Sequence, residues 1–135
     1  MESSDPNRAL NLSGVWRGQF SYPRKLPPVA FLATLEERDS WLVGATEEIA
    51  SFGDRRGVTI TASLQGRRTG TSVTWLKLYD HPPHFHAIHY VGVVSGDANE
   101  ISGRWQVPGS WSGAFLMVRN GDANVGRIRE ATETV

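Results

Sequence analysis

The middle of the chain alternates between apolar and polar residues with a period of two, which is typical of β-strands that bury one face. The clearest example starts at Val58, where Val58, Ile60, Ala62 and Leu64 alternate with Thr, Ser and Gln. Clusters of Gly, Pro, Asp and Asn interrupt the alternation and indicate turns. No stretch of ten or more residues carries the apolar stripe of a helix. The pattern predicts an all-β protein with strands at residues 12–22, 28–37, 40–48, 58–65, 70–79, 84–95, 101–107 and 111–120.

Eight consecutive strands with short connections favour an eight-stranded antiparallel up-and-down barrel, because closing the sheet removes its exposed edges. A β-sandwich is the main alternative. A barrel of about eight strands either fills its interior with side chains or holds one small ligand there.

Both ends of the chain are more polar than its middle. Residues 1–11 predict a polar N-terminal arm and residues 121–135 a polar C-terminal tail, on either side of a β-barrel domain at 12–120. All aromatic residues lie between Trp16 and Phe115. We therefore expect one domain in the 135-residue chain.

Composition excludes several kinds of chemistry. Lys plus Arg and Asp plus Glu both number 14, so the formal net charge is zero, and broad electrostatic binding of nucleic acid is not expected. The chain has no Cys, which excludes disulfides and thiolate ligands or nucleophiles. No apolar run approaches the roughly 18 residues of a membrane span, and the polar start lacks a signal-peptide core. We expect a cytoplasmic protein without a membrane partner.

The connections predict which end of the barrel carries function. In an up-and-down barrel, successive connections fall at opposite ends. Residues 38–39, 66–69 and 96–99 are short polar turns, whereas 23–27, 49–57, 80–83 and 108–110 are longer or contain Pro. Elaborated loops on a rigid scaffold are where binding usually takes place. The sequence therefore predicts a cup that opens at the end with these four loops.

Inward positions near this end supply candidate ligand-binding residues. If Trp41 and Val43 face inward, Glu47 lies on the same face, and an inward Trp75 brings Lys77 with it. A buried charge needs a partner, so we expect Glu47 to pair with Lys77. The opposite register would place Leu76 and Leu78 inside and Lys77 in water. Including residues from neighbouring strands, the predicted ligand-binding set is Tyr22, Glu47, Lys77, Tyr79, His86, Tyr90 and Trp111.

All four histidines lie within nine positions, at 81, 84, 86 and 89. On a strand, His84 and His86 project to the same side, which suits two metal ligands, while His89 points to the opposite face. The alternative is an exposed pair without metal. His86 instead belongs to the cup if it shares a face with Ile88 and Tyr90. No cofactor is predicted.

The segment Gly14-Val15-Trp16 resembles the Gly-x-Trp opening of the calycin barrels, which comprise lipocalins, avidins and their relatives. The resemblance implies that Trp16 closes one end of the barrel and stacks with an Arg near the end of the last strand. Arg119 is placed to be that partner, and a cation over an indole face contributes about 0.5–2 kcal/mol. The full avidin pattern is not present, so biotin binding is not implied.

These features lead to one main hypothesis and two alternatives. The main hypothesis is a small barrel that binds an apolar or aromatic molecule in its cup. The first alternative is an enzyme that uses Glu47 or His86 as base in the same cup. The second is an interaction module with a filled core that dimerises through outward apolar residues. We expect a homodimer or higher homo-oligomer in all three cases, through a face made by Ala30, Leu32, Leu42, Leu76, Leu78, Leu116 and Val118.

Overall fold

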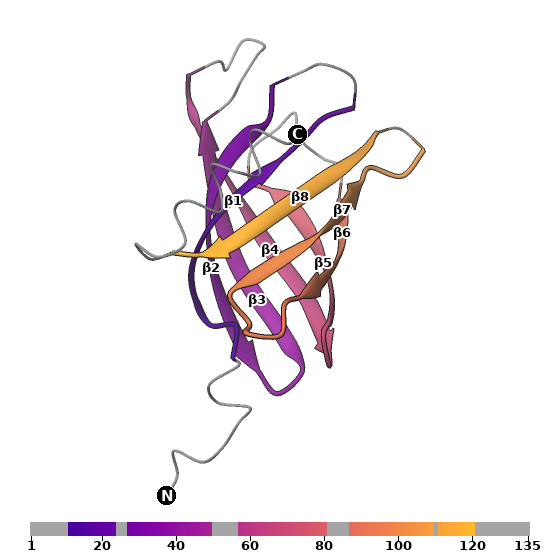
Figure 1. Ribbon diagram of the computed structural model, residues 1–135. Coiled ribbons are helices and arrows are strands. Elements are labelled where there is room, and N and C mark those ends of the chain that lie inside the picture. The colour runs from indigo at the N-terminus through magenta and orange to yellow at the C-terminus, as the bar shows by residue number, and fades with distance from the viewer. Residues whose placement is uncertain (1–10, 24–26, 50–56, 81–86, 110, 121–135) are drawn as a thin grey trace, which may run out of the picture.

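The computed structural model describes residues 11–23, 27–49, 57–80, 87–109 and 111–120, and these form a closed barrel of eight strands (Figure 1). Each strand pairs antiparallel with its neighbours in chain order, and β1 pairs with β8. The all-β, antiparallel up-and-down barrel expected from the sequence is confirmed. The strands are β1 (Gly14–Phe20), β2 (Val29–Arg38), β3 (Trp41–Ile49), β4 (Thr59–Thr69), β5 (Ser72–Tyr79), β6 (Ile88–Val94), β7 (Glu100–Gln106) and β8 (Ser112–Arg119).

Side chains alternate between the interior and the outer surface along most strands, as the period-two pattern predicts. On β2, Phe31, Ala33 and Leu35 are buried. On β4, Ile60 and Leu64 are buried, whereas Val58 precedes the strand and is exposed, which corrects its expected inward position.

Strand β3 has the opposite register to the one predicted. Leu42 is buried and Trp41 and Val43 are exposed, so the even-numbered residues face inward. The hairpin between β2 and β3 is the reason. Its two turn residues, Asp39 with φ 56° and Ser40, set Arg38 opposite Trp41, and this register puts the inward Leu35 opposite Gly44.

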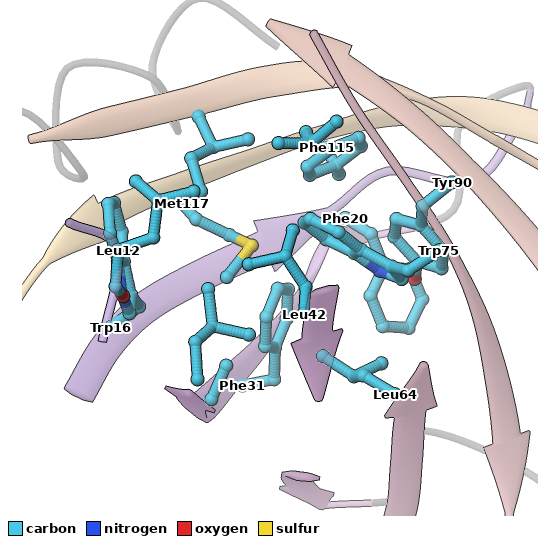
Figure 2. Packing of buried hydrophobic residues seen from close by; sticks show 14 of the residues in the cluster. Leu12, Trp16, Phe20, Phe31, Leu42, Leu64, Trp75, Tyr90, Phe115 and Met117 are labelled. Carbon is cyan, nitrogen blue, oxygen red and sulfur yellow. The ribbon is translucent and has the colours of Figure 1, made fainter. Parts of the chain in front are cut away.

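The interior is packed with aromatic and aliphatic side chains from all the strands. Figure 2 shows Leu12 and Trp16 on one side of the core and Trp75 and Tyr90 on the other. Phe115 makes an edge contact with Tyr90, with a distance of 4.9 Å between ring centroids. Burial of these side chains from water is the main stabilising contribution to the fold.

The absence of a side chain at Gly18 makes room for the ring of Phe31 inside the barrel. The ring of Phe31 lies directly over Gly18, so any side chain at position 18 would overlap the ring. This close approach explains a glycine in the middle of β1.

Short hairpins and the contacts of Arg119 close one end of the barrel. The guanidinium of Arg119 lies 4.5 Å from the ring centroid of Trp16, as the calycin resemblance implies. Arg119 also donates hydrogen bonds to the carbonyl oxygens of Asn11, Ser13 and Ala98, at 2.7–3.0 Å. We call this the sealed end.

Residues 39–40, 70–71 and 95–99 join strands at the sealed end, and the strand ends that flank the four longer connections lie at the opposite end (Figure 1). The alternation of short and long connections agrees with the sequence pattern. We call the second end the loop end. None of the described residues forms a helix that could cross a membrane.

Candidate functional site at the loop end

A buried ion pair lies inside the barrel toward the loop end. Lys77 of β5 donates a hydrogen bond from Nζ to Oε1 of Glu48 on β3, at 2.8 Å. The side chains are only 2% and 5% exposed. Strand β4 lies between the two, with Ile60 opposite Glu48 and Leu64 opposite Lys77. The ion pair therefore links β3 to β5 across β4.

Aromatic rings surround the ammonium group of Lys77. Its Nζ lies 4.7 Å from the ring centroid of Tyr79 and 4.8 Å from that of Phe20, with Phe31 and Tyr90 at 5.7 and 5.9 Å. The negative face of an aromatic ring attracts a cation, and the attraction strengthens where water is excluded. The rings and Glu48 together replace the water that the ammonium loses.

Burial and pairing act in opposite directions on Lys77. Burial lowers the pKa of Lys77, because the charged form loses its hydration, and the carboxylate of Glu48 opposes this shift. Lys77 and Glu48 form an ion pair, with Nζ 2.8 Å from Oε1, and the pair carries no net charge.

Three phenol groups share this region. Tyr79 donates a hydrogen bond from its hydroxyl to Oε1 of Glu48, at 3.0 Å. Burial and the negative charge of Glu48 raise the pKa of Tyr22 to about 12 and raise the pKa of Tyr79 and Tyr90 further. All three phenols are therefore neutral near neutral pH.

An aromatic rim lies next to the polar pair. Tyr22 makes edge contacts with Trp105 and Trp111, at centroid distances of 5.8 and 5.2 Å. The indole nitrogen of Trp105 donates a hydrogen bond to the carbonyl oxygen of Ser21, which fixes its ring. Trp111 is 41% exposed, so the rim reaches solvent. The loop-end cluster consists of Tyr22, Glu48, Lys77, Tyr79, Tyr90, Trp105 and Trp111.

Most of the residues predicted to share a site come together here. Tyr22, Lys77, Tyr79, Tyr90 and Trp111 all belong to the loop-end cluster, and the inward register of β5 that places Lys77 inside is the one observed. The expected partner of Lys77 was wrong.

Glu47 is exposed on the outer face of β3, because the two-residue hairpin sets even-numbered residues inward; Glu48 is the partner instead. Glu48 and Trp105 are the members that sequence reasoning missed. The length of the predicted turn could have identified Glu48.

The histidine predictions are only partly covered. His84 and His86, the candidate metal ligands, lie outside the described residues. His89 is exposed, on the opposite face of β6 from Tyr90, as expected. No group of metal-ligating side chains occurs among the residues that the structure describes.

The arrangement suits recognition of a molecule with an apolar face. The rim offers ring faces and edges, and the pair below it offers a fixed dipole. Glu48 accepts hydrogen bonds from both Lys77 and Tyr79 through the same oxygen, Oε1.

Comparison with known proteins supports the fold. The structure is similar to a redesigned β-barrel, with a TM-score of 0.68 at 11% sequence identity, covering 84% of this chain and 96% of that chain. It is also similar to apocrustacyanin C1, with a TM-score of 0.47 at 15% identity, covering 98% of this chain and 75% of that chain. No family model matches the sequence, and no curated protein matches it. At 11% identity, the similarity to the redesigned barrel concerns the fold alone.

Proposed function

We propose that this protein binds a small apolar or aromatic molecule at the loop-end cluster. The observation that carries the proposal is an aromatic rim, which reaches solvent at Trp111, beside a buried pair of charged groups. Ligand sites in proteins are mostly apolar and aromatic, with a few fixed polar groups that orient the ligand. The rim of Tyr22, Trp105 and Trp111 fits the first part of this description, and Glu48 with Lys77 fits the second.

Packing limits how deeply the molecule enters. The inward side chains nearer the sealed end, such as Trp16, Val73 and Met117, are 0–2% exposed, so they leave little unfilled surface. The ligand therefore lies on the rim, against Tyr22 and Trp111, with the Lys77–Glu48 pair beneath it.

Fluorescence titration with N-phenylnaphthylamine tests the proposal, because this uncharged dye brightens when it leaves water. We expect saturable binding by the wild-type protein that Trp111→Ala weakens about tenfold or more, which corresponds to about 1.4 kcal/mol. Trp41→Ala is the matched control, since Trp41 is also exposed but lies at the sealed end, on the outer face and over Arg67. Equal loss in both variants, or no saturable binding, would contradict the proposal.

We do not extend the proposal to catalysis. Of the two bases expected in the cup, Glu47 faces solvent and His86 lies outside the described residues. Glu48, which takes the place of Glu47, is already hydrogen-bonded to two side chains.

We also propose that the chain self-associates through the outer face of β5 and β6. Four apolar side chains there are exposed: Leu76 and Leu78 of β5, and Val91 and Val93 of β6, at 37–62%. Clustered apolar side chains on an outer sheet face are typical of protein contacts. Leu42, which we expected to contribute, faces the interior instead, and Val118 is buried. Leu76→Asp should lower the sedimentation coefficient to that of a monomer, and an unchanged value would rule out this face.

We propose that the protein is located in the cytoplasm. Fractionation of the host cell tests this location.

A further inference from the structure

Toward the loop end, the described part of the barrel interior contains one positive and one negative side chain, so their charges cancel. Among the described residues these are Lys77 and Glu48, in direct contact. Glu47 and Asp80 lie near the same end but are exposed, and Asp80 accepts a hydrogen bond from Thr61. The loop-end cluster therefore has no net charge to offer a ligand.

We propose that the loop-end cluster selects uncharged aromatic ligands and rejects ionised ones of either sign, through the Lys77–Glu48 pair. This inference rests on the proposed function and names the ligand class for the same site. If the Lys77–Glu48 pair only stabilised the fold, the affinity of the rim would not depend on the charge of the ligand.

Among the described residues, an anion finds no counter-charge that is not already paired. Lys77 Nζ has N–H groups besides the one that it donates to Glu48 Oε1, but an anion that accepted from them would share one positive charge with the buried Glu48 carboxylate. Taking Nζ fully would leave that carboxylate with only the hydroxyl of Tyr79. Removing one partner of a buried ion pair is strongly unfavourable, because the remaining charge is neither hydrated nor neutralised.

A cation meets a similar obstacle. Glu48 is neutralised by Lys77, and the ring faces of Phe20 and Tyr79, which could attract a cation, already lie against the Lys77 ammonium. A ligand cation would leave water without gaining a counter-charge. An uncharged aromatic molecule packs against Tyr22 and Trp111 and leaves the pair intact.

Three naphthalene derivatives of nearly equal size test the inference: naphthylmethanol, naphthoate and naphthylmethylammonium, which are neutral, anionic and cationic near neutral pH. Competition with N-phenylnaphthylamine for the wild-type protein measures the affinity of each compound. We expect naphthylmethanol to bind at least about tenfold more tightly than either ion. If naphthoate or the ammonium ion binds as tightly as the alcohol, the inference is overturned while the proposed function stands. If N-phenylnaphthylamine itself does not bind, both are overturned.

The variant Glu48→Gln identifies the pair as the cause. It leaves the Lys77 ammonium without its counter-charge, so the affinity for naphthoate should rise about tenfold relative to that for naphthylmethanol. Glu37→Gln is the matched control, because Glu37 forms a similar ion pair with Arg68 at the sealed end, at 2.9 Å. An unchanged ratio in Glu48→Gln, or the same change in Glu37→Gln, would overturn the inference. If Glu48→Gln does not fold, the three wild-type affinities decide.

Discussion

At the scale of single residues, the buried polar side chains differ in whether they have a hydrogen-bond partner. Thr46, Glu48 and Lys77 are three of these side chains. Glu48 and Lys77 satisfy each other, whereas the hydroxyl of Thr46 has no hydrogen-bond partner in the described part of the chain. Thr46 faces inward on β3, and its cross-strand neighbours are the buried Ala33 and Ala62. A buried hydroxyl without a partner costs free energy that the folded state must offset.

We therefore expect Thr46→Val to raise the free energy of unfolding by about 1 kcal/mol, since Val has the same shape without the hydroxyl. Urea denaturation measures the change. Thr34→Val is the control, because Thr34 is exposed on the outer face of β2 and should change stability by no more than about 0.5 kcal/mol. A loss of stability in Thr46→Val would show that the hydroxyl has a partner.

The tyrosines give a second prediction at this scale. Burial, followed by the charge of Glu48, raises the pKa of all three, to about 12 for Tyr22, so absorbance titration should show no phenol ionising near the ordinary value of 10.0. A group whose pKa is raised by folding stabilises the protein below its unfolded pKa, and that contribution is lost as pH rises above about 10. Lys77 acts in the opposite direction because its pKa is lowered. A phenol that ionises near 10 while near-ultraviolet dichroism stays native would contradict the burial of the loop-end cluster.

At the scale of elements, the two-residue hairpin before β3 decides which charged residue enters the barrel. In a hairpin of this length, odd-numbered residues of one strand lie opposite even-numbered residues of the next, and paired residues share a face. Because Phe31 and Leu35 face inward, Leu42 and Glu48 must do so too. Most apolar side chains of β3 lie on its outer face, and Leu42 is the exception, so the pattern of this strand alone favours the wrong register. The turn length that the sequence predicts would have resolved it.

Neighbouring residues of β3 test this register. Leu42→Ala should lower the free energy of unfolding by about 2–5 kcal/mol, because Leu42 is 2% exposed within the core (Figure 2). Val43→Ala should change it by about 0.5 kcal/mol, because Val43 is 44% exposed. Thermal or chemical denaturation measures both. The reverse order of effects would restore the register predicted from the pattern of β3 alone.

At the scale of the whole molecule, closure of the barrel depends on contacts between its first strand, β1, and its last strand, β8. Strand β8 pairs with β1, and the Arg119 side chain joins Trp16 to the backbone of residues 11–13 and to Ala98. The contacts of Arg119 with Trp16, Asn11 and Ser13 span more than a hundred residues, so they form only when the barrel closes.

Replacing Arg119 should weaken closure. We expect Arg119→Ala to lower the free energy of unfolding by about 2 kcal/mol, from loss of the cation–π contact and the hydrogen bonds to carbonyl groups. Arg119→Lys should recover part of the loss, because the charge remains but the planar fork of donors does not. Hydrogen exchange should localise the effect to β1 and β8, and uniform loss of protection in all strands would contradict this assignment.

The sequence by itself determined the strands, their up-and-down order, the sealed and loop ends, and the contact of Trp16 with Arg119. These follow from local period-two patterns, turn residues and a motif, each of which lies within a short stretch of chain. Only the tertiary structure decided that the inward acid of β3 meets Lys77 and that Trp105 and Trp111 flank Tyr22, whereas the facing of Leu42 and Glu48 follows from the pairing of β3 with β2. The physical reason is that the facing of a strand with apolar residues on both sides is set by its pairing with neighbouring strands, which its own sequence does not encode.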